Sequence, residues 1–495
     1  MRRAFRILRN VVLLLIAVAI VLAAVMVANT WRKPSRQIAV TPVAPVAVDE
    51  NAAAQRLGAA VKLQTIASAS DADQSADAFR ALHDLIAQSF PAFHAAAKRE
   101  IVANYSLLYT WEGSDPKAPP FALLAHQDVV PIAPGTEGDW QVPPFSGVVK
   151  DGFIWGRGSW DDKGNLFSML EAAEQLAKEG FKPKRTIYFA FGHDEEVSGK
   201  RGAIAMSKLL QSRGVKLDFA FDEGLLITDG ILKGVDKPVA LIGVAEKGYV
   251  TLTISTTATP GHSSLPPPDT AIGKLSAALA RLEKRPFPAS VSGVMRETLQ
   301  TVAPEMDFSS RLVLSNLWLL EPLVRAQLLK TAQTAATIRT TTALTIFNAG
   351  NKENVLPGRA EATVNFRLLP GETEESAIAR VKSVIGDDRI KVTPLPGNTN
   401  PPPMTSTATP SYQAVNRTIR EIFPDVLVAP GLMVAATDSR NYLDVTNNIF
   451  RFSPVRATAE DLKRFHGTNE RLSVANYADM IRFYRRLVQN AAGAE

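Results

Sequence analysis

The sequence lacks cysteine in all of its 495 residues. This absence excludes disulfide cross-links and thiolate metal sites, so any bound metal must be held by His, Asp and Glu side chains. It does not indicate a compartment, because a cysteine-free chain persists in reducing and oxidising spaces alike. The length predicts two domains, or one domain with a large insertion, because a single hydrophobic core rarely grows beyond about 250–300 residues.

Acidic residues are absent from the first 48 positions, which carry seven of the 55 Lys and Arg residues. The formal net charge of +6 therefore arises in this N-terminal segment, and the rest of the chain holds 48 basic and 49 acidic residues. A basic surface on the folded part, which nucleic-acid binding would require, is not indicated. We expect no nucleic-acid partner.

Residues 11–28 form an uninterrupted apolar run that follows four arginines. At about 1.5 Å per residue the run covers about 27 Å, close to the thickness of the hydrocarbon layer of a bilayer. A cleaved signal peptide is the competing interpretation, but its apolar core is usually only about 7–15 residues long. We expect residues 1–36 to hold an uncleaved single-pass transmembrane anchor with a cytoplasmic N-terminus. The catalytic part then lies on the non-cytoplasmic side, which is the periplasm in a bacterium.

The remainder of the chain divides into segments by its residue pattern. Residues 37–48 are rich in Pro, Ala and Val and predict an extended linker. Short apolar runs alternate with helical patterns in residues 49–245, which predicts an α/β fold with a mostly parallel sheet flanked by helices. Alternating strands around a long helical region predict an inserted α+β domain at residues 246–395. The catalytic domain resumes in residues 396–495.

Three predicted strands end on side chains that can bind a metal. In an open α/β sheet, ligands bind beyond the carboxyl ends of the strands. The strands at residues 121–125, 186–192 and 217–221 are followed by His126 and Asp128, by Glu195 and Glu196, and by Asp222 and Glu223. We therefore expect a metal site at this edge of the sheet, built from imidazole and carboxylate groups.

Two further residues are ambiguous when each is taken alone. Asp161 lies between a glycine-containing turn and a predicted helix, where an aspartate can simply cap the helix N-terminus. His466 is a lone histidine far along the chain, and a hydrogen-bonded loop residue is its simplest interpretation. Neither residue establishes a metal ligand without further support.

Five segments together resemble the zinc-site motifs of the co-catalytic dizinc metallopeptidase family that contains aminoacylase, carboxypeptidase S and succinyl-diaminopimelate desuccinylase. The segments are AHQDVVP at 125–131, GSWDDKG at 158–164, DEE at 194–196, DEG at 222–224 and HGTNE at 466–470. The resemblance covers the chain from about Asp49 to the C-terminus and is closest to the branch of carboxypeptidase S and N-acyl-amino-acid hydrolases. It implies a dizinc exopeptidase fold in which the inserted domain is a lid or a dimerisation domain.

The resemblance implies two Zn²⁺ ions per subunit. The implied ligands are His126, Asp161, Glu196, His466 and either Asp222 or Glu223. Asp161 would bridge both ions; His126 and the acid at position 222 or 223 would bind one ion, and the other two ligands would bind the second. Independent chemistry agrees, because two neighbouring metal ions need a shared anionic ligand.

Two catalytic side chains are implied as well. Asp128 would accept the other ring N–H of His126 and thereby fix the tautomer of that imidazole. Glu195 would act as the general base, taking a proton from the attacking water and delivering it to the leaving amine. The family pattern also implies a cis peptide bond between Asp161 and Asp162.

Substrate contacts are implied in the inserted domain and beside it. His262 and Asn354 resemble family residues that approach the scissile carbonyl, often across a dimer. Arg367 and Arg440 resemble residues that hold the substrate carboxylate, a task that suits the fork of a guanidinium group. From position alone, Arg367 could equally be a surface strand residue, and Arg440 could belong to a helix start.

The predicted activity is zinc-dependent hydrolysis of a peptide or N-acyl bond beside an amino acid with a free carboxylate. An aminoacylase-type hydrolase of N-acyl amino acids is the alternative, and an inactive zinc-binding recognition protein is a remote one. The remote alternative normally involves loss of the base or a ligand, whereas Glu195 and a residue for every ligand position are present. Further expected partners are the membrane, through the N-terminal helix, and a second copy of the chain, through the inserted domain.

Overall fold

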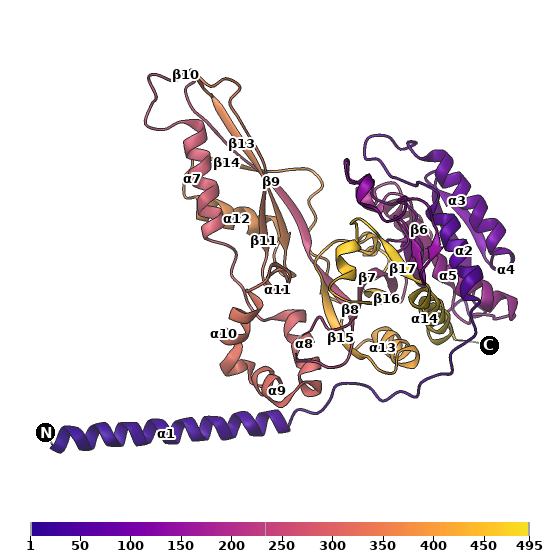
Figure 1. The fold of residues 1–495 in the computed structure, drawn as a ribbon, viewed down its shortest axis with the longest axis horizontal. Coiled ribbons are helices and arrows are strands. Elements are labelled where there is room, and N and C mark those ends of the chain that lie inside the picture. Colours follow the sequence, from indigo (N-terminus) through magenta and orange to yellow (C-terminus); the bar gives the residue numbers. More distant parts are fainter. Residues whose placement is uncertain (1, 233, 494–495) are drawn as a thin grey trace.

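The computed structural model describes residues 2–232 and 234–493. Figure 1 shows a long N-terminal helix, an α/β domain and an elongated lid that projects away from that domain. The α/β domain and the lid enclose separate hydrophobic cores. We propose that the inserted domain comprises residues 246–395, because the chain leaves one core after Glu246 and completes the lid sheet at Pro394.

The α/β domain is built around an eight-stranded sheet with the strand order β1-β2-β6-β3-β7-β16-β8-β15. The strands are β1 Lys98–Val102, β2 Ser106–Trp111, β3 Phe121–His126, β6 Ile187–Gly192, β7 Ala220–Thr228, β8 Val239–Glu246, β15 Leu427–Met433 and β16 Ile449–Ala457. The pairs β3–β6, β3–β7, β7–β16 and β8–β15 are parallel, whereas β1–β2 and β2–β6 are antiparallel. The pairs β16–β8 and β7–β8 are antiparallel as well, so the sheet is mixed: its central strands β6, β3, β7 and β16 are parallel, as predicted, whereas its flanks include antiparallel pairs.

Helices cover both faces of this sheet. In β3, which is buried along its whole length, Phe121 and Leu123 belong to one core, whereas Ala122 and Leu124 belong to the other. The first face packs against α2 Glu50–Val61, α3 Ala76–Ser89, α4 Pro91–Ala96, α5 Lys163–Lys178, α13 Pro410–Ile422 and α14 Val474–Ala492. The second face packs against α6 Ala203–Ser212. A strand covered on both faces is built from a continuous apolar run, as β3 is.

One strand differs from its predicted extent. The sequence predicts a strand at residues 217–221, whereas β7 spans Ala220–Thr228 and contains Asp222 and Glu223. Pairing with β16 extends the strand past both acids, and the register shifts beside them after Arg451. The two acids therefore lie within the strand and not beyond its end.

A small three-stranded sheet brings two distant loops together beside the strand ends. β4 (Val149–Lys150) pairs with β5 (Phe153–Trp155), which also pairs with β17 (Arg471–Ser473). The chain after β5 leads to Asp161, and the chain before β17 contains His466. These two loops consequently lie next to each other at the edge of the large sheet.

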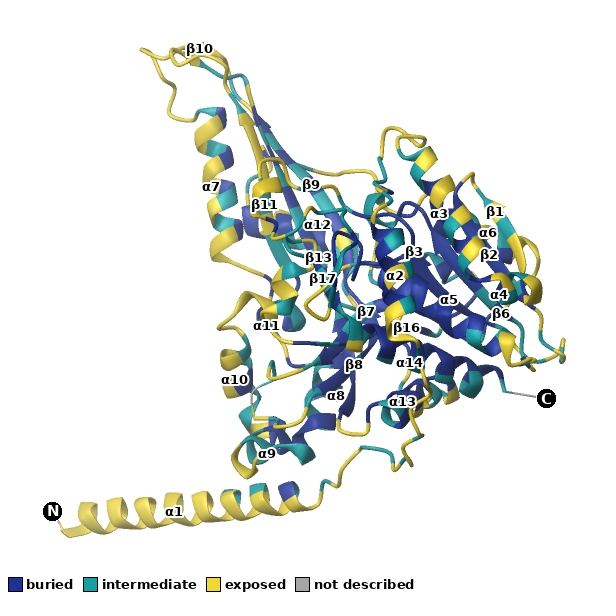
Figure 2. Cartoon of the chain, turned by 45° about the vertical axis from the view of Figure 1, so that its right-hand side comes forward, coloured by how far each residue is buried: buried dark blue, intermediate teal, exposed yellow. Residues whose placement is uncertain are grey.

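The lid contains a four-stranded antiparallel sheet with the order β11-β13-β9-β14, covered by two helices. Its elements are β9 Gly248–Thr257, α7 Ala271–Lys284, β11 Thr341–Ala349, β13 Arg359–Leu368, α12 Glu374–Ile385 and β14 Lys391–Pro394. A short pair, β10 (Gly261–His262) with β12 (Val355–Leu356), forms the tip. The tip is exposed and lies far from the large sheet in both Figure 1 and Figure 2.

Four further helices of the inserted segment enclose a core of their own. They are α8 Gly293–Val302, α9 Phe308–Ser315, α10 Leu317–Leu328 and α11 Ala332–Ile338. This helical subdomain packs on the edge strand β15, where Thr298 Oγ1 donates to the carbonyl of Pro430 at 2.7 Å. Lys247, between β8 and β9, donates from Nζ to the carbonyls of Ala336 and Arg339, both at 2.9 Å. The lid is therefore tied to the helical subdomain where it leaves the catalytic sheet.

The N-terminal helix α1 spans Arg2–Trp31 and is long and apolar enough to cross a membrane. Its apolar stretch is not buried against the rest of the protein. The following segment is extended, as expected for a linker, but it lies on the catalytic domain. Gln37 donates from Nε2 to the carbonyl of Val428 at 3.0 Å, and Arg482 donates from Nε to the carbonyl of Val46 at 3.1 Å.

Candidate metal centre

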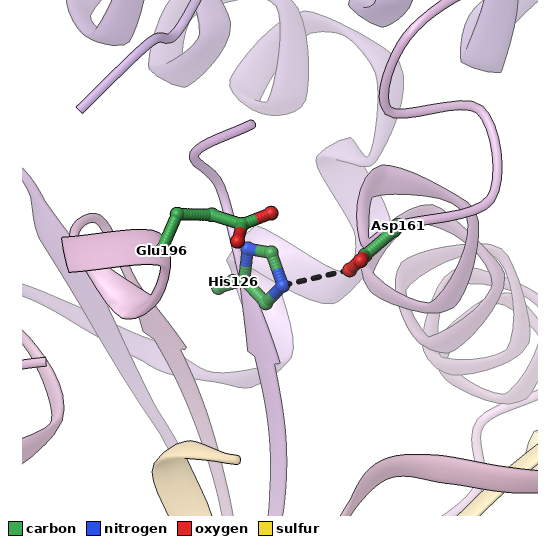
Figure 3. A group of neighbouring side chains, drawn as sticks. All are labelled: His126, Asp161 and Glu196. Atoms are coloured by element: carbon green, nitrogen blue, oxygen red, sulfur yellow. Dashed lines mark hydrogen bonds and ion pairs between the residues drawn. The ribbon is translucent and has the colours of Figure 1, made fainter. Parts of the chain in front are cut away.

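His126 is the last residue of β3, at the carboxyl edge of the sheet. Its Nε2 lies 3.0 Å from Oδ1 of Asp161, and the carboxylate of Asp162 accepts its backbone N–H at 3.1 Å. Ligand atoms of His126, Asp161 and Glu196 all lie within 4.8 Å of one another. Figure 3 shows these three side chains converging on a common point. The structure thus brings together residues from three separate segments of the chain.

Asp161 contacts two imidazoles. Its second carboxylate oxygen, Oδ2, lies 2.7 Å from Nε2 of His466. The same Nε2 lies 3.2 Å from Oε1 of Glu196. The peptide bond between Asp161 and Asp162 is cis, as the family resemblance implies. One carboxylate therefore stands between two imidazoles that come from loops far apart in the sequence.

Asp128 holds both His126 and the loop that follows β6. The backbone carbonyl of Asp128 lies 3.0 Å from Nδ1 of His126, and its carboxylate lies 3.4 Å from the same nitrogen. The carboxylate also accepts the backbone N–H groups of Glu195 and Glu196 at 3.1 and 3.0 Å. Asp128 therefore fixes the position of an imidazole and of two acidic residues at once.

The neighbouring acids Asp222 and Glu223 differ in what surrounds their carboxylates. Asp222 accepts the backbone N–H of Ser439 at 2.7 Å and that of Glu223 at 3.1 Å, one on each oxygen. Glu223 has a buried Oε2 with no hydrogen-bond partner among the described residues. Burial raises the pKa of Glu223 well above its usual value, and the charges of Asp222 and Asp162 add to this effect. Glu223 is thus the acid whose oxygen is free to take a ligand.

Glu195 begins the short turn after β6, next to Glu196. Burial raises the pKa of Glu195 well above its usual value, and the negative charges of Asp438, Glu196 and Asp128 raise it further. A carboxyl group with a raised pKa is suited to accept a proton and release it again near neutral pH.

Glu470 contacts the loop that carries Asp161, a role that the sequence alone did not indicate. Its Oε1 accepts the backbone N–H groups of Gly158, Trp160 and Asp161 at 2.9, 3.0 and 3.2 Å. Its Oε2 accepts from Nη1 of Arg157 at 2.5 Å. The only signal in the sequence was its place at the end of the HGTNE segment. The structure shows that this fully buried acid fixes the loop that carries Asp161.

The predicted lid residues are brought together, but not with the metal cluster. His262 lies in β10, and the backbone N–H of the following Ser263 donates to the carbonyl of Asn354 at 3.1 Å. Both His262 and Asn354 are exposed at the lid tip, which points away from the strand ends (Figure 1). Within one chain they therefore do not reach the cluster around His126.

The two predicted carboxylate-binding arginines lie near the start of the lid. The guanidinium group of Arg367 stacks over the ring of Tyr249, 4.6 Å from its centre. Nη1 of Arg440 lies 4.0 Å from Oε1 of Glu246, the last residue of β8. Burial lowers the pKa of Arg367, and the positive charge of Arg440 contributes to that shift. The two guanidinium groups thus act on each other electrostatically.

The donor set fits divalent metal ions. The carboxylates of Asp161 and Glu196 contact imidazole nitrogens, and Asp161 and the nearby Glu223 are buried, where a carboxylate charge is unfavourable unless it is neutralised. The unpartnered Oε2 of Glu223 supplies a free ligand atom. Imidazole and carboxylate groups are also the ligands that zinc takes where cysteine is absent. Such a cluster at the strand ends of an α/β sheet, with a lid beside it, defines a metal-dependent hydrolase.

Comparison with known proteins specifies the family. The model of peptidase family M20/M25/M40 matches residues 122–490, so the chain belongs to this metallopeptidase family. It is 41% identical over 478 residues to the probable carboxypeptidase S-like 2 of Dictyostelium discoideum, covering 94% of this chain and 91% of that protein. It is 43% identical over 443 residues to the N-fatty-acyl-amino acid synthase/hydrolase PM20D1 of Mus musculus, covering 88% and 87%.

A solved structure has the same fold. The M20 family metallo-carboxypeptidase Sso-CP2 from Sulfolobus solfataricus superposes with a TM-score of 0.64 at 16% sequence identity, covering 90% of this chain and 99% of that one. The predicted dizinc-exopeptidase type of fold is thereby confirmed.

Proposed function

We propose that this enzyme uses two zinc ions per subunit to hydrolyse the amide bond between an acyl or peptidyl group and an amino acid with a free carboxylate. The position of Asp161 carries the proposal. Its two oxygens face Nε2 of His126 and Nε2 of His466 at 3.0 and 2.7 Å. A carboxylate placed in this way suits a ligand shared by two ions, which co-catalytic sites require.

Glu223 is our choice for the remaining ligand. Both oxygens of Asp222 already accept backbone N–H groups, whereas Oε2 of Glu223 has no such partner within the described part of the chain. With Asp161 and Glu196 the site then holds three carboxylates. A single divalent ion would leave one of these three ligand charges uncompensated, whereas two ions compensate all three.

Bound zinc would lower the pKa of a water molecule and polarise the substrate carbonyl. The protein positions the remaining groups. Glu195 takes the proton of the attacking water and delivers it to the nitrogen of the leaving amine. Asp128 keeps the backbone of Glu195 and the ring of His126 in fixed relative positions. Arg367 and Arg440 bind the substrate carboxylate by paired hydrogen bonds.

The relatives support this substrate class. One is described as a probable carboxypeptidase and the other as an N-fatty-acyl-amino acid hydrolase, and both kinds of substrate place an amino-acid carboxylate beside the scissile amide. The two kinds of substrate differ in the group on the carbonyl side of the amide, which is peptidyl in one and fatty acyl in the other. Steady-state rates on an N-oleoyl amino acid and on a dipeptide with the same C-terminal residue separate the two activities.

Exchange of Glu195 for glutamine tests the chemistry. The side chain keeps its size, and Asp128 still binds the backbone N–H, so metal binding should persist. Turnover should fall by about 10²–10⁴-fold, the usual contribution of a general base. Glu196→Gln is the matched comparison, because it should lose metal together with activity. Normal turnover in the Glu195 variant would remove this residue from the mechanism.

A homodimer through the lid is the expected assembly. β11 is an edge strand whose Ile346 and Phe347 are 53% and 45% exposed, and unpaired apolar edges favour pairing with another chain. A groove of about 370 Å³ lies between this strand and α7. A partner's lid could also bring His262 and Asn354 to the metal site, which one chain alone does not.

We further propose that α1 is a membrane anchor with a cytoplasmic N-terminus. The arginines before its apolar run support this orientation, and the absence of buried residues in that run supports a span. Mass spectrometry of the protein extracted from membranes tests the proposal, because a cleaved signal peptide would leave a product without α1.

A further inference from the structure

The C-terminal end of α1 is docked on the helical subdomain. Nδ2 of Asn316, at the junction of α9 and α10, donates to the carbonyl of Met26 at 3.0 Å and to Oγ1 of Thr30 at 3.3 Å. Lys33 donates from Nζ to the carbonyl of Ser315 at 2.5 Å. Arg311 donates from Nη2 to the carbonyls of Thr30 and Lys33 at 3.3 and 3.0 Å. The helical subdomain is thus fixed to the end of the candidate membrane span.

These contacts set the height of the subdomain relative to a bilayer. Met26 lies two residues inside the end of the apolar run at residues 11–28, which corresponds to about 3 Å of helix rise. Asn316 therefore lies at the boundary of the hydrocarbon layer when α1 spans the membrane. In Figures 1 and 2, α9 lies against the C-terminal part of α1, and α10 runs from α9 toward the lid.

The exposed face of α10 is apolar. The most exposed residues of this helix are Trp318, Leu319, Pro322, Leu323, Ala326 and Gln327, and none of them carries a charge. The charged side chains of the helix, Arg325 and Glu321, lie beside this stripe, 3.7 Å apart and 40% and 20% exposed. Trp318 and Leu323 are 57% and 60% exposed. A helix on the surface of a soluble protein normally presents polar residues to water. An uncharged stripe of this kind needs an apolar cover.

Two exposed tryptophans indicate what covers the apolar face of α10. Of the six tryptophans, only Trp31 and Trp318 are exposed; the other four are buried in the catalytic domain. Trp318 donates from Nε1 to Oδ1 of Asn316 at 3.2 Å, and Trp31 follows Thr30, which contacts the same asparagine. Tryptophan is enriched where the hydrocarbon layer meets the headgroups. Arg311 and Lys33 also contact this end of α1, and basic side chains near a membrane surface are attracted to anionic lipids.

From the continuity of this face with α1, we infer that α10 lies in the outer interface of the bilayer that α1 spans. Trp318, Leu319 and Leu323 enter the lipid. The inference rests on the proposed anchor. The proposed ligand of the exposed face of α10 is the lipid surface. A protein partner bound to the same face would contradict the inference.

Depth-dependent fluorescence quenching tests the inference on the full chain. The protein is reconstituted in phosphatidylcholine vesicles with and without bromine near the top of the acyl chains. The emission difference between wild type and Trp318→Phe isolates the signal of Trp318, and Trp31→Phe isolates that of Trp31. We expect brominated lipid to remove more than half of each signal, because bromine quenches indoles at the depth of the interface.

Each outcome decides a separate point. Quenching of Trp31 without quenching of Trp318 would overturn the inference and leave the anchor intact, including where a second protein covers α10. Absence of quenching at both positions would overturn the anchor as well. Leu323→Glu should make Trp318 accessible to acrylamide, whereas the matched control Ile101→Glu, at an exposed site in β1, should not.

Discussion

Replacing Glu470 by glutamine should loosen the loop that carries Asp161. In the wild type, one oxygen of Glu470 accepts three backbone N–H groups from residues 158–161. The other oxygen pairs with Arg157, whose Nη2 also donates to the carbonyl of His466 at 3.0 Å. Glutamine retains the carbonyl oxygen for the backbone groups. Its amide nitrogen, however, would face Arg157 as a second donor.

The magnitude follows from burial. The side chains of Arg157 and Glu470 are only 3% and 0% exposed. Breaking a buried ion pair by removing one partner costs about 3–5 kcal/mol, because the other charge stays buried without compensation. At roughly 2 °C per kcal/mol, the thermal midpoint should fall by about 6–10 °C. Zinc affinity should fall by about 10–100-fold, the usual effect of disturbing a residue that orients a ligand.

Thermal unfolding followed by tryptophan emission is a suitable assay, because Trp160 lies in the affected loop and donates its backbone N–H to Glu470. Competition with a chelator measures the zinc affinity. Glu50→Gln is the matched control: Glu50 pairs with Arg482 at 3.4 Å but is 45% exposed, so its loss should cost no more than about 1 kcal/mol. Equal midpoints and equal zinc affinities for the two variants would refute the role of Glu470.

Three further changes test other features. Glu223→Gln should remove about one zinc equivalent, whereas Asp222→Asn should lower the thermal midpoint and retain metal, because Asp222 accepts backbone N–H groups; equal metal loss in both would contradict the ligand choice. Burial lowers the pKa of Lys247 to about 7 from the ordinary 10.5, so between these values only the unfolded chain binds this proton. The stability of wild type relative to Lys247→Met should therefore rise from pH 7 towards pH 10 in thermal scans, and a constant difference would count against the buried lysine. Ile346→Asp should shift the protein to monomers in light scattering while leaving its thermal midpoint near that of wild type, and an unchanged dimer would exclude β11 as the interface.

The parts of the fold that depend on local pattern were predictable. The helical patterns that alternate with apolar runs in residues 49–245 correspond to helices such as α5 and α6, which follow strands of the sheet. β3 was visible as a short apolar run between polar segments. β7 was placed wrongly because its length depends on pairing with β16, more than 200 residues later. The separate core of α8–α11 and its packing on β15 also depend on distant contacts that no local pattern reveals.

The residues of the candidate site also differ in whether a local sequence pattern could predict them. His126 and Glu196 were predictable from strand ends, because the topology of an open α/β sheet collects such residues at one edge. Asp161 and His466 were indicated by family resemblance, since each alone fits a cap or a loop residue. Glu470 could not be found from pattern, because its role consists of hydrogen bonds to a loop about 310 residues earlier in the chain.

Charge at the start of the lid bears on how the substrate is held. Glu246 is buried and pairs with Arg451 through Nε at 2.7 Å, and Arg440 lies 4.0 Å from its other oxygen. Arg367, whose pKa is lowered in part by Arg440, adds a further positive charge to this region. One carboxylate thus faces several guanidinium groups, and Nη2 of Arg451 is buried without a partner among the described residues. The excess of positive charge is what a substrate carboxylate would neutralise. Because Lys247 fixes the start of the lid next to this region, a bound carboxylate would also affect how the lid is held relative to the catalytic domain.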